Sequence, residues 1–147
     1  MRGSLALEAN HGAVRGDARD LAVHANRSPF HLVVTSPPYW DLKEYGEDYD
    51  GSQLGHIKDR ESFLGELDDV WKQCLDLLEP GGRLCVVVGD VCRSRKAHGR
   101  HVVEPLHAYL QVQCQKLGFD PLAPIIWSQI PNATTQLTRK GTGFLRQ

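Results

Sequence analysis

The feature that most restricts the fold of this chain is the alternation of short apolar runs with longer amphipathic segments. Three runs are short and rich in β-branched side chains, which is typical of buried strands, and they span residues 30–35, 84–88 and 125–127. Two segments carry apolar side chains at three- and four-residue steps, which predicts amphipathic helices over 59–78 and 102–117. This order predicts an α/β fold in which helices flank a parallel sheet.

The segments around the first strand add detail to this prediction. A short helix is expected over residues 18–25, with Asp17 as its N-cap. The strand over 30–35 must end at Pro37-Pro38, because proline cannot donate to a strand ladder. Apolar residues in 39–57 recur at no regular spacing, so a long loop is expected there. Loops of that length more often than not have a function.

Composition predicts one ordinary globular domain. The 147 residues are 41% hydrophobic and 24% charged with a net charge of -1, which argues against disorder and by itself gives no hint of nucleic acid. Basic residues gather in 93–100 and 139–146, which permits one basic face, although solvated loops show the same pattern more often. No apolar stretch suits a signal peptide or a membrane span, so a cytoplasmic protein is expected.

The cysteines predict no metal site. The four cysteines form no CxxC pair, and three of them fall in apolar segments, so reduced and buried thiols are expected. A zinc site can be drawn from Cys92, His98, His101 and His107, but this spacing matches no common ligand pattern.

The candidate site follows the first predicted strand. Ligands of an open parallel sheet bind beyond the carboxyl ends of its strands, where Ser36-Pro37-Pro38-Tyr39 is expected. A pair of prolines fixes an extended turn whose carbonyl oxygens point outward as rigid acceptors, which an amino group on a nucleobase requires. Pro-Pro alone would be read as a strand terminator, whereas Thr-Ser before it and Tyr-Trp after it favour a functional turn.

The hexapeptide Thr35-Ser36-Pro37-Pro38-Tyr39-Trp40 resembles the catalytic motif of S-adenosylmethionine-dependent DNA amino-methyltransferases, in which Asp, Asn or Ser precedes Pro-Pro and an aromatic residue. Other similar segments follow the family's order and spacing, and they are 16–18, 79–82, 88–90 and 125–127. The resemblance implies a Rossmann-like methyltransferase fold, S-adenosyl-L-methionine as the cofactor and double-stranded DNA as the partner. Restriction and modification systems are the family's usual setting.

The resemblance also implies a role for each residue of the motif. A base must leave the duplex to be methylated, and Tyr39 and Trp40 are the residues expected to bind it, with Tyr39 as the stacking platform. The Ser36 hydroxyl and the Pro37 carbonyl are expected to accept hydrogen bonds from the exocyclic amine, so that Ser36, Pro37, Pro38 and Tyr39 form the catalytic set.

Cofactor contacts are implied for Asp17, Thr35 and Ser36, while the N-cap role of Asp17 is an equally good account of that residue. Serine in the first motif position is typical of relatives that methylate N4 of cytosine, and adenine N6 remains the alternative.

The resemblance covers only the first part of such an enzyme. No Phe-x-Gly-x-Gly cofactor loop is present, so 1–128 is predicted to be the catalytic half of the domain and 129–147 the start of a target-recognition segment. We therefore expect a fragment, with little activity unless a C-terminal half or partner chain completes it. RNA and protein-glutamine methyltransferases are alternatives, but they usually place the glycine loop upstream and Asn first. A non-catalytic remnant also remains open.

Overall fold

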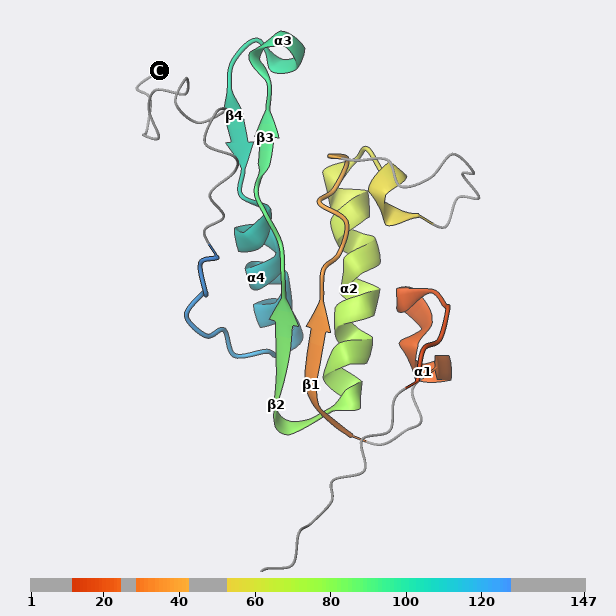
Figure 1. Cartoon of the computed structure of the whole chain (residues 1–147). Helices are drawn as coiled ribbons and strands as arrows, with labels where there is room; N and C mark the ends of the chain where they lie inside the picture. The colour runs from red at the N-terminus through yellow and green to blue at the C-terminus, as the bar shows by residue number, and fades with distance from the viewer. Residues whose placement is uncertain (1–11, 25–28, 43–52, 128–147) are drawn as a thin grey trace, which may run out of the picture.

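The computed structural model describes residues 12–24, 29–42 and 53–127 (Figure 1). In chain order the elements are η1 (Ala18–Asp20), α1 (Leu21–His24), β1 (Phe30–Thr35), η2 (Leu54–His56), α2 (Arg60–Leu77), β2 (Leu78–Val86), β3 (Val91–Arg93), α3 (Arg95–His98), β4 (Val102–Glu104) and α4 (Leu106–Leu117). The predicted recognition segment 129–147 and the middle of the predicted long loop lie outside the described residues.

Strands β1 and β2 pair in parallel, which confirms the predicted parallel arrangement for the first two strands. Val33 lies opposite Leu84 and Thr35 opposite Val86, after an irregularity in register near the start of β1. The Val87 N–H donates to the Thr35 carbonyl at 2.8 Å just beyond the last of these pairs. Both strands therefore end at the same edge of the sheet.

Helices α2 and α4 pack against each other and against one face of this sheet (Figure 1). Helix α2 begins at the N-cap Asp59, whose side chain accepts from the Ser62 N–H at 2.8 Å. Its apolar side chains recur at helical spacing and turn inward, where they supply most of the buried core: Phe63, Leu64, Leu67, Val70, Trp71 and Cys74 from α2, with Val91, Leu106 and Leu110. Full burial of such a side chain contributes about 1.5–3 kcal/mol each.

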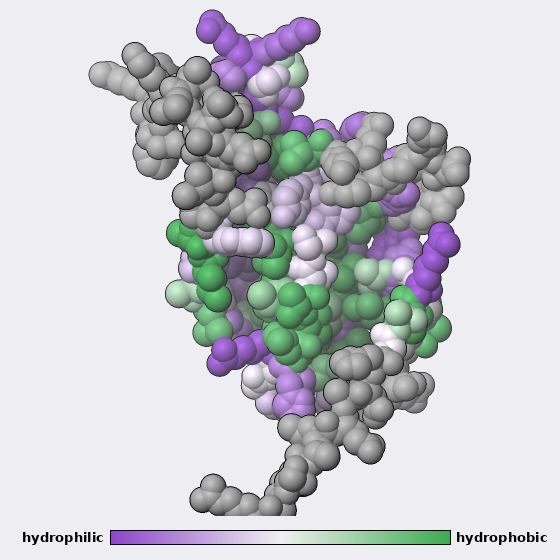
Figure 2. All heavy atoms as spheres, viewed as in Figure 1, coloured by the Kyte–Doolittle hydropathy of each residue, from purple (hydrophilic) through white to green (hydrophobic). Residues whose placement is uncertain are grey.

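The opposite face of the sheet is left open by the residues that the structure describes. Leu32 and Val34 of β1 are 55% and 62% exposed, and Val87 just after β2 is 40% exposed. In the view of Figure 2 the strands lie in front of the helices, and apolar residues gather over the middle of this surface. An apolar surface of this kind on a sheet marks a place where more structure packs.

One predicted element is wrong, and another begins later than predicted. Residues 125–127 form no strand, and Ile125 and Ile126 are 94% and 88% exposed, because the described sheets offer them no neighbouring strand. The second helix begins at Leu106, and Val102–Glu104 instead pairs antiparallel with Val91–Arg93. Pro105 explains the shift, since proline disfavours helical backbone in the residue before it.

The cysteine prediction holds only in part. All four thiols are free, but Cys85 and Cys92 are exposed, while burial raises the pKa of the Cys74 thiol and raises that of Cys114 to about 11. Among the described residues, no group of three or more His, Cys, Asp or Glu side chains is placed to hold a metal ion. Within that same part of the chain, no helix is both long and apolar enough to cross a membrane.

Candidate catalytic site

The motif turn leaves the carboxyl end of β1 with its prolines anchored and its serine exposed. Pro37 is buried, Pro38 and Tyr39 are half-buried, and Ser36 lies at the surface. Proline has only one backbone dihedral to fix, so burying Pro37 holds the turn at little entropic cost. The serine hydroxyl is thus presented at the open edge of the sheet by a rigid backbone.

The ring of Tyr39 lies against Gly89, which follows strand β2. A Cβ atom added at Gly89 would lie 3.3 Å from Cε2 of the tyrosine ring, closer than most side-chain contacts. The absence of a side chain at Gly89 therefore lets the two strand ends approach. Tyr39 also packs against the buried core, which fixes the ring on both the strand and the helix side.

Arg93 of strand β3 holds the end of the motif. Its guanidinium carbon lies 4.2 Å from the centroid of the Trp40 ring, and its Nη1 lies 2.7 Å from Oδ1 of Asp41. The side chains of Arg93 and Asp41 are only 14% and 19% exposed, so solvent screens this pair weakly. Trp40 has a positive φ of 52°, and Leu42 N–H donates to the Tyr39 carbonyl at 3.2 Å to close the turn. Arg93 thus stabilises a backbone conformation that a tryptophan seldom adopts.

Asp17 caps the first helical turn, as predicted, by accepting from the Arg19 N–H at 2.8 Å. Hydrogen bonds from the Arg19 guanidinium, which lies 2.6 Å away, lower the pKa of the Asp17 carboxyl from 3.8 to about 2. Arg19 also bonds Glu66 at 2.6 Å, which ties this segment to α2. The side-chain hydrogen bonds and the ion pair described for Asp17 all run to Arg19, and none reaches the motif, so its cofactor role stays a prediction.

Thr35 and Trp40, the first and last residues of the motif, make different contacts. The Thr35 carbonyl is used in the sheet, and its side chain is half-buried, so its predicted cofactor contact also stays a prediction. Trp40 is held by Arg93 and packs on the core. Ser36 to Trp40 are thereby brought together at one edge, with Gly89 beside them.

Gly89 and Arg93 are the residues that sequence reasoning missed. In the sequence, Gly89 stands out only within the segment 88–90 that is similar to the family, and Arg93 falls within the basic stretch 93–100, a pattern more common in solvated loops. The structure corrects the second point, because Arg93 is largely buried and paired. Within one sequence, no local signal tells Arg93 apart from Arg95 or Arg100, since its partner lies 52 positions away.

Asp90 connects the end of β2 to the start of α4. Its Oδ1 lies 2.6 Å from Nδ1 of His107 and 3.4 Å from the His107 backbone nitrogen. This contact orients the chain as it passes from the sheet into β3. Asp90 therefore acts here as a tether between two elements.

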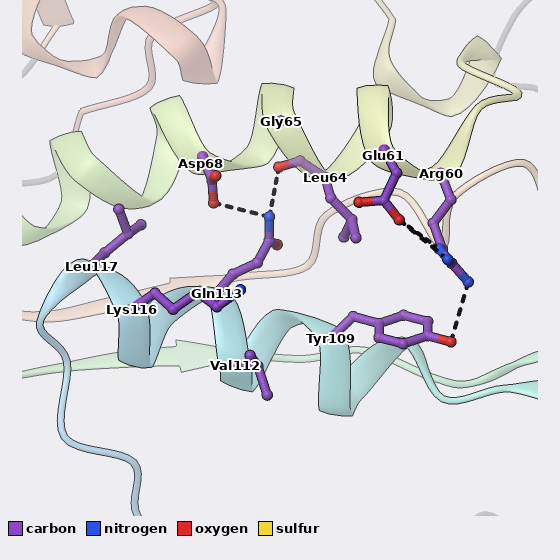
Figure 3. Close-up of a pocket in the computed structure, with 10 residues that line it drawn as sticks. All are labelled: Arg60, Glu61, Leu64, Gly65, Asp68, Tyr109, Val112, Gln113, Lys116 and Leu117. Carbon is purple, nitrogen blue, oxygen red and sulfur yellow. Dashed lines mark hydrogen bonds and ion pairs between the residues drawn. The ribbon is translucent and has the colours of Figure 1, made fainter.

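A hollow of the described surface lies elsewhere, between α2 and α4 (Figure 3). It measures about 380 Å³, and Gln113 bridges it by donating to the Leu64 carbonyl at 2.8 Å and to Asp68 at 2.9 Å. Arg60 lies 5.0 Å above the Tyr109 ring at one end. The bridging contacts join the two helices, and no motif residue lines the hollow, so we interpret it as a helix-packing groove.

Comparison with known proteins places the chain in a family. A family model for DNA methylases of the N6/N4 type matches residues 30–142, and the chain belongs to this family. The sequence is 29% identical over 162 residues to the Type II methyltransferase M.MjaI of Methanocaldococcus jannaschii, and 35% identical over 75 residues to M.SmaI of Serratia marcescens.

A solved structure agrees with this placement. A Thermus thermophilus protein assigned as a DNA modification methylase, in complex with S-adenosyl-L-methionine, superposes with a TM-score of 0.63 at 47% identity over 89% of this chain. The match confirms the predicted Rossmann-like methyltransferase fold, of which this chain supplies a part. The chain spans 52% of M.MjaI, 25% of M.SmaI and 47% of the Thermus protein.

Replacement of Gly89 by alanine tests the contact with Tyr39. We expect Gly89→Ala to lower the free energy of unfolding by about 1 kcal/mol, because the added methyl group forces the ring or the strand end to move. Gly65→Ala is the matched control, since a Cβ atom there meets nothing within 4 Å. The control should raise stability by about 0.5–1 kcal/mol, as alanine does in a helix. Urea unfolding measures both, and equal shifts of the same sign would contradict the contact.

The Asp17 and Arg19 pair predicts a dependence of stability on pH. The folded pKa of Asp17 is about 2 against an ordinary 3.8, so the ionised carboxylate stabilises the fold above about pH 4, and this contribution disappears as pH falls toward 2. Because the Asp17 side chain is 43% exposed, solvent screening limits the effect to about 1 kcal/mol or less.

Asp17→Asn isolates the charge, since asparagine caps a helix as well as aspartate. The wild type should be more stable than Asp17→Asn at pH 7, and the difference should shrink between pH 4 and pH 2. Urea unfolding across this range measures it. A difference that stays constant down to pH 2 would show that the carboxylate charge plays no part.

Proposed function

We propose that this chain supplies the catalytic half of a DNA methyltransferase that moves a methyl group from S-adenosyl-L-methionine to the exocyclic amine of a flipped base. The observation that carries the proposal is the position of the motif. Ser36 lies exposed at the carboxyl end of β1, and Tyr39 rests on Gly89 at the end of the neighbouring parallel strand. That edge is where ligands of open α/β sheets bind. The family of the chain and the cofactor bound in its Thermus relative support the proposal.

The side chains at this edge have charges and hydrogen-bonding groups that fit S-adenosylmethionine. Residues 35–40 carry no charged side chain, and the nearby guanidinium of Arg93 is paired with Asp41. The neutral acceptors of the motif, together with the ionised carboxylate of Asp17, are compatible with a sulfonium cation. We propose Asp17, Thr35 and Ser36 as the residues of this chain that hold it. When bound, S-adenosylmethionine supplies the electrophilic methyl carbon.

The chain's own residues bind and orient the base. Extruding a base from the duplex costs a few kcal/mol, and stacking on an aromatic ring returns about 1–3 kcal/mol. Tyr39, braced by Gly89, is the proposed platform, and Trp40 flanks it. The Ser36 hydroxyl and the Pro37 carbonyl accept hydrogen bonds from the amine, which aligns its lone pair for in-line attack.

Cytosine N4 is the favoured target, because serine stands in the first motif position. Adenine N6 is the alternative, and a restriction and modification system in the cytoplasm is the proposed setting.

The exposed apolar face of the sheet supports a further proposal, that this chain needs additional structure to be active. Leu32, Val34 and Val87 are exposed on that face, and Ile125 and Ile126 after α4 are also exposed. Such apolar area is unusual on a protein that acts alone. We propose that residues 1–128 form one half of the methyltransferase domain, that 129–147 begin a recognition segment, and that a C-terminal half or a partner chain completes the fold.

Methyl transfer tests the proposed activity. This chain, carried through whatever sequence naturally follows it, should transfer labelled methyl from S-adenosylmethionine to duplex DNA. We expect the label on N4 of cytosine, and its loss in Ser36→Ala and Tyr39→Ala, which remove the acceptor and the stacking ring. Label on N6 of adenine would favour the alternative. No transfer to any DNA by a folded chain would contradict the proposal and favour a remnant.

Cofactor binding by the 147 residues alone tests the proposed need for completion. We expect a dissociation constant of about 1 mM or weaker by isothermal titration calorimetry, because half of the binding surface is proposed to lie outside these residues. Binding clearly tighter than this by the isolated chain would show that the site is complete without a second half.

A further inference from the structure

We propose that the tip of the β3–β4 hairpin, residues 94–101, binds the phosphate backbone of duplex DNA beside the catalytic site. This inference deepens the proposed function and rests on it. The tip carries Arg95, Lys96 and Arg100 with two histidines and no acidic residue. All eight of its residues are exposed.

The cations of the tip differ from those at the base of the hairpin in having no acidic partner among residues 12–24, 29–42 and 53–127. At the base, Arg93 pairs with Asp41 at 2.7 Å, and Glu104 lies 3.6 Å from Arg60. Within the part of the chain that the structure describes, no acidic side chain lies within ion-pair distance of Arg95, Lys96 or Arg100. Their positive charge is therefore available to an external anion.

The tip is an ordered support for these charges. Helix α3 begins after Ser94, whose hydroxyl accepts from the Ala97 N–H at 3.4 Å, and ends at Gly99 with φ of 73°. A left-handed glycine is a common way to end a helix, and any other residue would be strained there. The turn between β3 and β4 thereby carries its cations on an ordered backbone.

The hairpin projects from the edge of the sheet that carries the motif. Strand β3 continues from the carboxyl end of β2, and the tip stands beyond both strand ends (Figure 1). In the same view, hydrophilic residues cover this projection (Figure 2). At its base, Arg93 lies against Trp40 of the motif and Val91 is completely buried, so the hairpin is anchored beside the proposed base pocket.

Duplex DNA matches this arrangement because its charge is regular and independent of sequence. One negative charge occurs per about 1.7 Å of helix axis, so phosphates flank any flipped base. Contacts to phosphate position a protein on the duplex without reading bases. A basic tip at a fixed position relative to Tyr39 would serve this purpose.

The test compares two variants that lose the same number of positive charges. The tip variant is Arg95→Gln, Lys96→Gln and Arg100→Gln. The control is Lys72→Gln, Arg83→Gln and Lys116→Gln, which lie outside the hairpin, with Lys72 in the second half of α2, Arg83 within β2 and Lys116 in the last turn of α4. Circular dichroism and thermal unfolding should be unchanged in the tip variant, since its three side chains make no buried contact.

Fluorescence anisotropy with a labelled duplex of mixed sequence measures binding at pH 8 over a series of salt concentrations. We expect the tip variant to bind at least about tenfold more weakly at about 0.1 M salt, with a log–log salt slope smaller by about 2 to 3, as three lost phosphate contacts require. The control should bind like the wild type.

Separate outcomes overturn this inference and the proposed activity. Three results would each overturn the role of the tip. The tip variant and the control bind duplex DNA equally, the wild type binds no duplex DNA, or the tip substitutions weaken binding to single-stranded RNA alone. If the tip controls DNA binding but the wild type transfers no methyl group, the inference stands and the proposed activity fails.

Discussion

The parallel pairing of β1 with β2 is the interaction on which the rest of the structure depends. Two adjacent parallel strands require a crossover, and α2 provides it by burying Phe63, Leu67 and Trp71 beneath the sheet. Because both strands then end at one edge, the turn after β1 meets the segment after β2. Tyr39 and Gly89 are 50 positions apart in sequence, and this pairing is the reason that they touch.

The motif is held by neighbours rather than by its own sequence. Burial fixes Pro37, Gly89 leaves space for the Tyr39 ring, and Arg93 binds both Trp40 and Asp41. A bulky residue at positive φ costs on the order of 1–3 kcal/mol, which the surrounding contacts must offset. Strain of this kind is found where a backbone must be held in one conformation, as positioning of a reacting group requires.

One face of the sheet is covered by helices and the other is exposed. This difference is consistent with the chain's matching only part of the length of its relatives. Helices α2 and α4 cover one face, while Leu32 and Val34 lie on the other without a covering layer among the described residues. The chain spans about half of M.MjaI and of the Thermus methylase. A sheet with one covered face is what half of a doubly covered α/β domain presents.

The sequence by itself determined the elements whose signals are local. The β-branched run of β1, the apolar period of α2 and the Pro-Pro turn were all predictable, and so was the identity of the motif, because each is specified within a few consecutive residues. Asp17 was likewise predictable as a cap.

Only the tertiary structure decided what depends on distant partners. Glu104, which precedes Pro105, adopts an extended conformation and pairs with Val91. Residues 125–127 form no strand, because neither described sheet pairs with them. The role of Arg93 arises from a partner 52 positions away, so nothing local separates it from the cations of the tip. Strand pairing and ion pairing join residues that are neighbours in space alone, and for that reason the pattern along one chain cannot determine them.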